Sequence, residues 1–301
     1  MPAVSIVIVC MNRPDNLGPC LDSIKQHTTS EYEVYVVAYR FSTDNLSAMK
    51  AAYPWVNFII NNSISGFSEN NNLALKEVKS EYCFILNDDT ELPGPTIDRL
   101  IADFRALPPD AAIVAAKLLN ADGSLQLCGR PDYPPFRYVL QQWHLYSEPT
   151  DNGKGLFRTF NVSGAAFLIK TAIFKELGWF DERYFFTPED IALSTLARRR
   201  GYSVWCDSDA EVIHKWRTTA SRLAPALRPA SIRGSLIFFS DGSSLRYLVL
   251  GAGVWAAEMV KRIKALIQGR RQDYLTYKHN TRSIFTHRSP KQIFIKYFNE
   301  I

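Results

Sequence analysis

Closely spaced cysteines, long apolar runs and phosphate-loop motifs are all missing from this 301-residue sequence. None of its five cysteines forms a Cys-x-x-Cys pair, which argues against a disulfide framework or a zinc site and favours a reducing compartment. The apolar run at 247–257 ends at Glu258, short of the roughly 20 residues that span a bilayer. No basic residue precedes the apolar N-terminus, so we expect residues 4–10 to form a strand and not a signal peptide.

Charge is unevenly distributed along the chain. The formal net charge is +5, but from Arg228 to the end thirteen Lys and Arg stand against four Asp and Glu. That is +9 for this part, which leaves −4 for residues 1–227. The asymmetry indicates an anionic surface as a partner for the C-terminal part, and we expect no nucleic-acid partner. A hydrophobic content of 47% predicts a sizeable core.

The first half of the sequence alternates between strand and helix patterns. Apolar runs predict strands, and amphipathic segments between them predict helices, one of which starts near Ser68 as its N-cap. The strands are expected at 4–10, 32–39, 56–61, 82–87 and 111–119, and the helices at 16–27, 68–80 and 95–107. This rhythm predicts an open, mostly parallel α/β sheet flanked by helices, with ligands beyond the carboxyl ends of the strands.

Two adjacent carboxylates, Asp88 and Asp89, follow the strand at 82–87. Their repulsion and desolvation disfavour such a pair unless a cation or solvent compensates the charge. An ordinary turn is the alternative, because Asn, Asp and Thr are common turn residues. Residues 120–160, rich in Gly, Pro and aromatic residues, are expected to form a long loop region, such as a lid or an insertion.

Seven segments, taken in order and with their spacing, resemble the GT-A glycosyltransferases of family 2. They are VSIVIVCMNRPDNLGPCLDSI, YEVYVVAYRFSTDN, NNSISGFSENNNLAL, FILNDDTEL, VSGAAFLIK, GWFDERYFFTPEDIALSTLARRRGY and AEVIH. The sequence is most similar to the bacterial rhamnosyltransferase-like branch, which builds O-antigen, capsule and related surface polysaccharides. The resemblance implies a Rossmann-like GT-A catalytic domain over 1–225, divided into a nucleotide-sugar-binding part (1–119) and an acceptor-side part (120–225). A basic, amphipathic helical region is expected at 226–301.

The resemblance implies a divalent metal, Mn²⁺ or Mg²⁺, as cofactor. Asn87-Asp88-Asp89 matches the family's D-x-D-like motif, which binds a metal that bridges the two phosphates of the donor. Asp89 takes the last position of the motif, and Asn87 replaces the first Asp. His214 matches a His that joins the metal or the diphosphate, although a lone His is more often structural. Lys215 and Arg217 are candidates for phosphate contacts, or are solvated surface charges.

The resemblance places the catalytic base in the segment TPEDIALSTLARRRG. Asp190 falls on the base position, with Glu189 beside it, and the base would take the proton of the acceptor hydroxyl. The structural alternative is that Thr187-Pro188-Glu189-Asp190 forms a capping box, with Pro at the first helical position. Both readings are compatible, because a helix start is a rigid place for a carboxylate.

Donor and acceptor residues are also carried over from the resemblance. The family's acidic residue after the second strand is absent, and Tyr39 or Asp44 is expected to contact the base or ribose, which leaves uridine and thymidine undecided. The other candidates for donor binding are Asn12, Arg13, Asn71 and Gly164, besides Asn87 and Asp88 of the metal motif. Trp179, Phe180 and Asp181 are expected to bind the acceptor sugar, with core packing as the alternative for Phe180.

Residues 259–271 alternate apolar and basic side chains at helical spacing. This pattern predicts a helix in the interface of an anionic membrane, or a helix packed on the protein or on a second subunit. A homo-oligomer is therefore left open. The resemblance implies a polyprenyl-linked or glycan acceptor, and a cytoplasmic protein that lies peripherally at the inner face of the plasma membrane.

The leading hypothesis is a metal-dependent, inverting transfer of a sugar from dTDP-rhamnose or a UDP-sugar to a glycan or lipid-linked acceptor. One alternative is a non-catalytic module that binds glycan or nucleotide on the same fold, supported by the missing acid after the second strand. A second is a nucleotidyltransferase, which would be expected to have a Gly-rich basic loop after the first strand. The segment CMNRPDNLGP is not Gly-rich.

Overall fold

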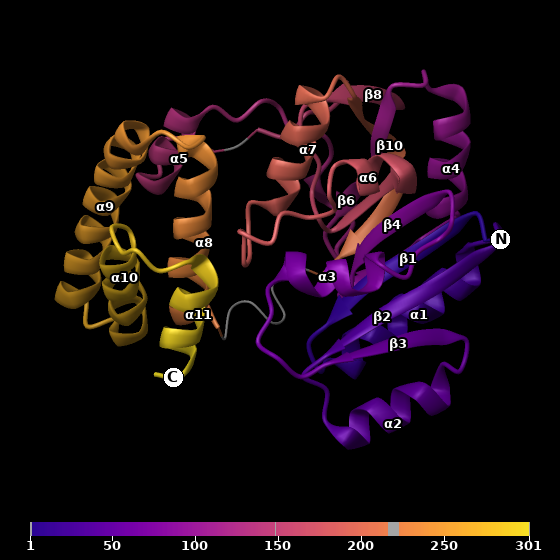
Figure 1. Ribbon diagram of the computed structural model, residues 1–301, viewed down its shortest axis with the longest axis horizontal. Helices are drawn as coiled ribbons and strands as arrows, with labels where there is room; N and C mark the ends of the chain where they lie inside the picture. Colours follow the sequence, from indigo (N-terminus) through magenta and orange to yellow (C-terminus); the bar gives the residue numbers. More distant parts are fainter. Residues whose placement is uncertain (1, 148, 216–222, 301) are drawn as a thin grey trace.

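The computed structural model describes residues 2–147, 149–215 and 223–300, and its centre is a mixed sheet (Figure 1). The strands in this part of the chain are β1 (Val4–Cys10), β2 (Tyr32–Tyr39), β3 (Val56–Asn61), β4 (Tyr82–Asn87), β5 (Thr90–Glu91), β6 (Ala111–Leu119), β7 (Leu125–Leu127), β8 (Leu156–Thr159), β9 (Ala166–Lys170) and β10 (Ser203–His214). Their order is β3-β2-β1-β4-β9-β6-β10-β5, with β7 on β6 and β8 on β10.

The five strands predicted in the first half form with the expected bounds. β1 pairs in parallel with β2 and with β4, and β2 with β3, so four carboxyl ends meet at one edge. β9 differs from the expected parallel arrangement, because it runs antiparallel between β4 and β6. β10 is parallel to β6, so the six long strands β1–β4, β6 and β10 still share one direction.

Helices cover both faces of this sheet. They are α1 (Pro14–His27), α2 (Thr43–Ala52), α3 (Phe67–Leu75), α4 (Thr96–Ala106), α6 (Thr171–Glu176) and α7 (Glu189–Arg199). α1, α2 and α4 share one core cluster, with Ile6 and Ile8 of β1. α3, α6 and α7 share the other, with Val7 of β1. Alternate residues of β1 thus face opposite clusters, which is why its sequence is apolar throughout.

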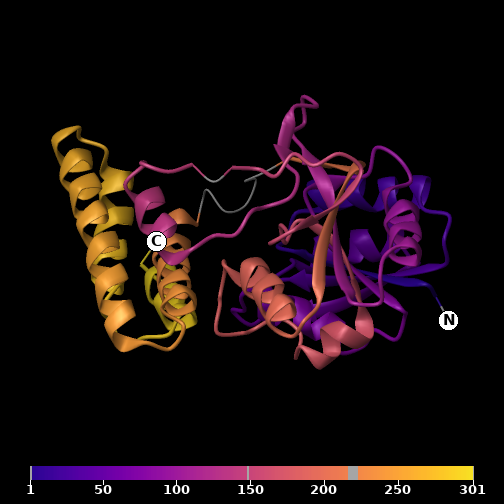
Figure 2. The ribbon, with the colours of Figure 1, turned by 90° about the horizontal axis from the view of Figure 1, so that it is seen from above.

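Four C-terminal helices and one from the middle of the chain form a separate layer (Figure 2). They are α5 (Pro135–Gln142), α8 (Ala224–Ser240), α9 (Ser244–Ile267), α10 (Arg271–Ser283) and α11 (Pro290–Phe298). The expected loop region at 120–160 therefore contains β7, α5 and β8, and α5 is anchored because Trp143 Nε1 donates to Gly253 O at 3.1 Å. In the described part of the chain, no helix combines the length and apolar character needed to cross a membrane.

The helical layer is attached to the sheet through α3 and the segment before α7. Phe185 and Phe294 stack with ring centroids 4.4 Å apart, and Lys291 Nζ lies 2.8 Å from Glu69 Oε1. α3 begins at Phe67 with Gly66 as N-cap, so the prediction of Ser68 as N-cap is wrong. Glu69 accepts the N–H of Gly66 and thereby satisfies one of the donors at the helix start.

Candidate active site

A cavity of about 810 Å³ opens where the carboxyl ends of β1, β2 and β4 meet the start of α7, the end of β10 and the helical layer. Eight residues that the sequence singled out line it: Tyr39, Asn87, Asp88, Asp89, Gly164, Glu189, Asp190 and His214. The parallel register places Val9 beside Asn87 and Cys10 beside Ala38, so the sheet itself brings these strand ends together. The cavity lies where ligands bind in open α/β sheets.

Asp89 and His214 face each other across the end of the sheet. The short strand β5 pairs with the end of β10, with His214 opposite Thr90, and this pairing carries Asp89 to the histidine. His214 Nε2 lies 3.2 Å from Asp89 Oδ1, and the Asn87 side-chain amide is 3.4 Å from the same nitrogen. His214 Nδ1 lies 2.7 Å from Gln126 Oε1. An amide oxygen only accepts, so Nδ1 carries a proton and donates to it.

This arrangement suits a hard cation. Because Nδ1 donates to Gln126, Nε2 is the ring nitrogen that faces the Asp89 carboxylate. In the neutral ring Nε2 carries the lone pair, and a cation between it and the carboxylate would remove their repulsion. Within the described ranges, no three His, Cys, Asp or Glu side chains are grouped closely enough to hold a metal by themselves. Mg²⁺ sites commonly use one or two protein ligands and complete the shell with water and substrate phosphate oxygens. The residues present therefore fit a metal that is shared with a phosphate ligand.

The two adjacent carboxylates at the end of β4 have different environments. Burial raises the pKa of Asp88 to about 7; a hydrogen bond with the Cys10 thiol acts in the opposite direction, and the charge of Asp89 raises it further. Asp88 Oδ2 is buried and has no hydrogen-bond partner. The repulsion expected between neighbouring acids is thus reduced, because Asp88 favours its neutral form while Asp89 faces His214.

Asp190 is fixed in the first turn of α7, where it lines the same cavity. Its Oδ2 accepts hydrogen bonds from Arg130 Nη1 and from the backbone N–H of Gly164, both at 3.1 Å. Its Oδ1 accepts from the backbone N–H of Ile191 at 2.7 Å. The side chains of Arg130 and Asp190 are 16% and 14% exposed, so this ion pair is largely removed from water.

The surroundings of Glu189 favour its neutral form. Burial raises the pKa of Glu189 to about 8, and the charge of Asp190 contributes to the increase. Glu189 Oε2 is buried and has no hydrogen-bond partner. The expected capping box is not formed, because α7 begins at Glu189 with Pro188 as N-cap and without a side-chain cap bond. Asp190 still satisfies a donor of the first turn through Ile191.

Gly164 lies directly against the carboxylate pair, and its backbone N–H donates to Asp190 Oδ2. A Cβ on Gly164 would lie 3.6 Å from Asp190 Cβ and 3.8 Å from Glu189 Oε1, which are ordinary contact distances. The protein alone therefore has room for a methyl group here. Tyr39, also at the wall, accepts a hydrogen bond from the Ser65 N–H through its hydroxyl at 3.3 Å.

Four predicted donor-binding residues are not among the described residues that line the cavity: Asn12, Arg13, Asp44 and Asn71. Asn12 accepts hydrogen bonds from the backbone of Ser42 and the amide of Asn45, so it fixes the start of α2. Arg13 pairs with Asp15 at 2.6 Å, and Asp44 lies in the exposed first turn of α2. Asn71 is buried and donates to Phe67 O within α3. Its neighbour Asn70 lines the cavity instead.

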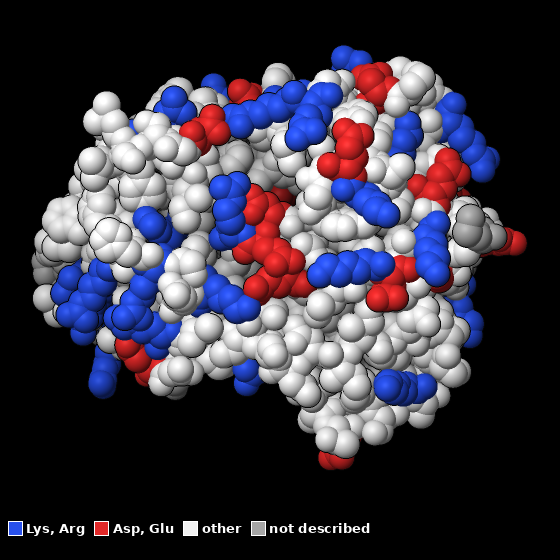
Figure 3. Space-filling view, in the orientation of Figure 1, with Lys and Arg blue, Asp and Glu red and all other residues white. Residues whose placement is uncertain are grey.

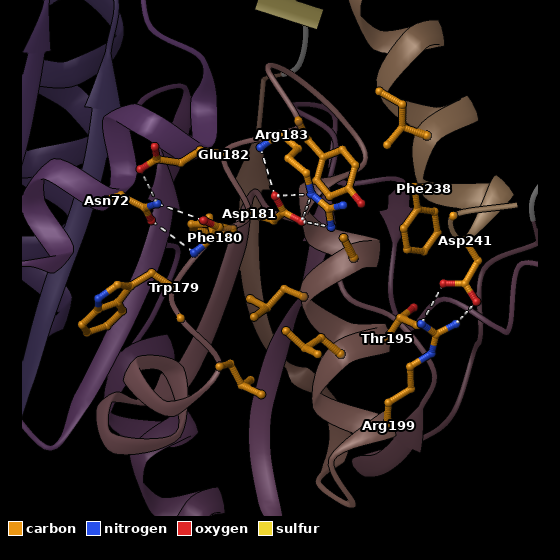
Figure 4. A pocket seen from close by; sticks show the side chains of 18 residues that line it. Asn72, Trp179, Phe180, Asp181, Glu182, Arg183, Thr195, Arg199, Phe238 and Asp241 are labelled. Carbon is orange, nitrogen blue, oxygen red and sulfur yellow. Dashed lines mark hydrogen bonds and ion pairs between the residues drawn. The ribbon is translucent and has the colours of Figure 1, made fainter. Parts of the chain in front are cut away.

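The predicted acceptor residues Trp179, Phe180 and Asp181 line a second cavity of about 500 Å³ on the other side of α7 (Figure 4). Phe180 is buried, and its ring contacts those of Phe67, Phe167 and Phe174, in agreement with the core-packing alternative. Asp181 accepts hydrogen bonds from the backbone and guanidinium of Arg183. The structure does not bring these three side chains to the Asp89–His214 side.

The helical layer supplies a wall that the sequence did not predict. Leu223, Ala224, Leu227, Arg228 and Ser231 at the N-terminal end of α8, and Phe294 of α11, line the cavity opposite the strand ends. Phe185 and Phe186, just before α7, complete this largely apolar side. Lys215 Nζ pairs with Glu91 and its backbone N–H donates to Asp89 O, while Arg217 lies outside the described residues.

Comparisons with known proteins agree with this geometry. The family described as Glycosyl transferase family 2 matches residues 5–178. The chain is 27% identical over 240 residues to O-antigen biosynthesis protein RfbC of Myxococcus xanthus, covering 76% of this chain and 18% of that protein. It is 26% identical over 203 residues to N-acetylglucosaminyl-diphospho-decaprenol L-rhamnosyltransferase of Mycobacterium tuberculosis, covering 62% of this chain and 63% of that enzyme. The chain thus spans less than two thirds of either relative.

A solved structure shares the fold. The crystal structure of GalNAc-T7 with UDP, GalNAc and Mn²⁺ superimposes with a TM-score of 0.59 at 17% identity, over 73% of this chain and 44% of that one. This similarity confirms the predicted GT-A fold, with its central sheet between helices. The family match confirms the family expected from the seven sequence segments.

Proposed function

The chain belongs to glycosyl transferase family 2, and from this premise we propose that it transfers one sugar, with inversion, from a nucleotide-diphosphate donor to a glycan or lipid-linked acceptor. One observation carries the proposal. Asp89, His214 and Asp190 line a single cavity, and the two carboxylates have different partners: Asp89 faces His214, whereas Asp190 accepts from Arg130 and Gly164. These different partners suit different tasks, one towards the leaving diphosphate and one towards the attacking hydroxyl.

Asp89 and His214 would hold the divalent metal, Mn²⁺ or Mg²⁺. When bound, the metal neutralises the charge that develops on the nucleotide diphosphate as it leaves. Gln126 orients His214 by accepting a hydrogen bond from Nδ1–H, which keeps Nε2 directed at Asp89. Asp88 lies behind this pair, and its raised pKa limits the negative charge at the strand end.

Asp190 is proposed as the base. As the acceptor oxygen bonds to the anomeric carbon, the bond from that carbon to the phosphate oxygen breaks, and the hydroxyl proton passes to the Asp190 carboxylate. Arg130 and Gly164 hold Oδ2 in place, which fixes the direction of the carboxylate. Glu189 is the poorer candidate, because its raised pKa keeps it protonated near neutral pH.

The acceptor side of the proposal rests on the wall formed by the helical layer. Leu227, Phe294 and Phe185 offer an apolar surface beside the Asp190 carboxylate. Arg228 is the one Lys or Arg that lines the cavity in the described part of the chain, and it suits a phosphate group. These features support an acceptor with sugar, phosphate and lipid parts, such as a polyprenyl-diphosphate-linked sugar of the kind in the name of the Mycobacterium tuberculosis relative.

We propose that the transferred sugar is rhamnose from dTDP-rhamnose or a sugar from a UDP donor. The relatives named for O-antigen biosynthesis and rhamnosyl transfer support this proposal. We place the reaction in the cytoplasm, at the inner face of the plasma membrane. All five cysteines are buried and free, which supports a reducing compartment.

A donor panel tests the function directly. The purified chain is incubated with Mn²⁺ or Mg²⁺, a polyprenyl-diphosphate-linked sugar and, in turn, dTDP-rhamnose, UDP-glucose, UDP-N-acetylglucosamine and GDP-mannose. Released nucleotide diphosphate and extension of the acceptor are scored together, with Asp190→Asn as the control for background hydrolysis. We expect one donor to give acceptor extension that excess EDTA abolishes. Binding of a donor without extension or release would favour the non-catalytic binding module.

A further inference from the structure

α9 has an uncovered apolar face on the outer side of the helical layer. At about 100° per residue, its large exposed apolar side chains fall within an arc of roughly 140°, which places them on one side of the helix. They are Leu245, Leu248, Val249, Trp255, Val260, Ile263, Leu266 and Ile267. We call this set the α9 outer face. Ile267 is 80% exposed, and Ile263 is 51% exposed.

The α9 outer face is not part of the core. The opposite side of α9 packs on α5 and α10 through Leu250, Gly251, Val254, Ala257 and Ala265, all of which are buried. α9 is therefore apolar on two sides, one of which is buried in the helical layer and the other exposed. Contiguous apolar surface of this extent on a soluble domain indicates an interaction site.

Basic and aromatic residues border the α9 outer face. On the helical projection Arg246 and Lys264 flank it on one side and Arg262 on the other, while Arg270 and Arg271 follow the end of the helix. Figure 3 shows Lys and Arg gathered over the lower part of the C-terminal helices, next to an uncharged upper part. Long basic side chains at such a border extend their charges towards lipid phosphates while their stems remain among apolar groups.

Negative charge is almost missing from this helix. Its single acid, Glu258, is fully buried and bonded to Lys261 Nζ at 2.7 Å and to the Asn280 amide at 2.6 Å. The α9 outer face therefore presents cations without compensating carboxylates of its own helix. A second copy of the chain paired through the same face would bring basic borders together, whereas an anionic bilayer would neutralise them.

We propose that the α9 outer face lies in the headgroup interface of an anionic bilayer, with its aliphatic side chains among the acyl chains and its basic borders on lipid phosphates. Trp255 sits at the edge of the face, where indole rings favour the polar–apolar boundary. The inference rests on α9 alone and does not require sugar transfer. A failure of one proposal therefore leaves the other intact.

Vesicle binding by the full chain tests the proposal. Co-sedimentation is measured with vesicles of phosphatidylglycerol and phosphatidylcholine and with vesicles of phosphatidylcholine alone. We expect binding to the anionic vesicles that weakens as salt is raised. The double variant Leu248→Ser, Ile263→Ser should bind at least about tenfold more weakly, since two aliphatic side chains leave the acyl region. The control is Ile60→Ser on β3, because Ile60 is also 51% exposed.

Two further measurements separate a bilayer from a protein partner. Brominated lipids should quench tryptophan emission of the wild-type chain, and Trp255→Phe should reduce this quenching. Arg246→Glu with Lys264→Glu should abolish the preference for anionic vesicles while nucleotide diphosphate binding is unchanged. The proposal is overturned if neither kind of vesicle binds the chain. It is equally overturned if Ile263→Ser dissociates a dimer in sedimentation and leaves vesicle binding intact.

Discussion

Asp190→Asn separates the structural task of this carboxylate from its proposed task as the base. Three donors surround it: Arg130 Nη1 and Gly164 N at Oδ2, and Ile191 N at Oδ1. An asparagine offers one oxygen, so at least one donor loses its acceptor and meets an N–H group instead. A lost hydrogen bond to a charged group costs about 1.5–3 kcal/mol, and the largely buried ion pair with Arg130 is lost as well. We expect the free energy of unfolding to fall by about 2 kcal/mol.

The effect on turnover is expected to be much larger than this stability loss. A base that cannot accept a proton lowers kcat by roughly 10²–10⁴-fold, while binding of metal and nucleotide diphosphate stays near normal because Asp89 and His214 are unchanged. Urea denaturation, steady-state transfer and calorimetric titration with the nucleotide diphosphate give the three quantities separately.

Arg130→Gln is the matched control, because it removes the same ion pair and leaves the carboxylate. We expect a similar loss of stability, with kcat reduced by no more than about tenfold. If Asp190→Asn turns over within a few-fold of the wild type, Asp190 is not the base. Glu189 is then the next residue to test.

Three other changes give distinct outcomes. Asp89→Ala should lower the transfer rate by about 10²-fold or more and abolish metal-dependent binding of nucleotide diphosphate in calorimetry, with an unchanged far-UV circular dichroism spectrum. Full activity of the variant, or of the wild type in excess EDTA, would contradict the metal assignment. In urea denaturation, the free energy of unfolding of Glu189→Gln should exceed that of the wild type by up to a few kcal/mol at pH 8 and by little at pH 4. The folded-state pKa of Glu189 is raised to about 8, so wild-type stability falls between about pH 4.5 and 8, where the unfolded chain ionises first. Parallel pH profiles of the two proteins would refute this. Gly164→Ala should fold normally but weaken donor binding. Gly66→Ala should be destabilised in thermal denaturation, because its Cβ would lie 2.2 Å from Phe185 O. Equal stability losses in the two variants would show that Gly164 is needed for packing and not for donor binding.

The strands of the first half were predictable because each is mostly apolar and bounded by polar residues. β1 and β4 are buried on both faces, so their sequences are nearly continuous apolar runs, whereas a helix of the same length with one buried face would have polar residues on the other. The direction of β9 was not predictable. Its antiparallel place between β4 and β6 depends on pairings with residues about 55 and 85 positions earlier in the chain. The apolar run AFLIK suits a parallel and an antiparallel strand equally well.

Residues that line the cavity were predictable where a carboxylate or histidine follows a strand or starts a helix, as at Asp89, His214 and Asp190. Arg130 was missed because it meets Asp190 across 60 residues of chain and has no local pattern. Sequence reasoning assigned donor binding to Asn71, whereas Asn70 lines the cavity. Three successive asparagines look alike in the sequence, but a shift of one position on a helix changes the direction of the side chain. An aromatic residue such as Phe180 has the same sequence signature in a core and in a sugar site.

The wall that the helical layer forms comes from a separate part of the chain. Leu227, Arg228 and Phe294 lie on α8 and α11, whereas Asp89 and His214 lie at the ends of β4 and β10. Substitution in α8 and α11 therefore changes the shape and charge of one wall and leaves the residues proposed to hold the metal in place. Exchange of this C-terminal segment between relatives offers a route by which one donor chemistry is directed to new acceptors. Chimeras joined before α8 make that modularity an experimental variable.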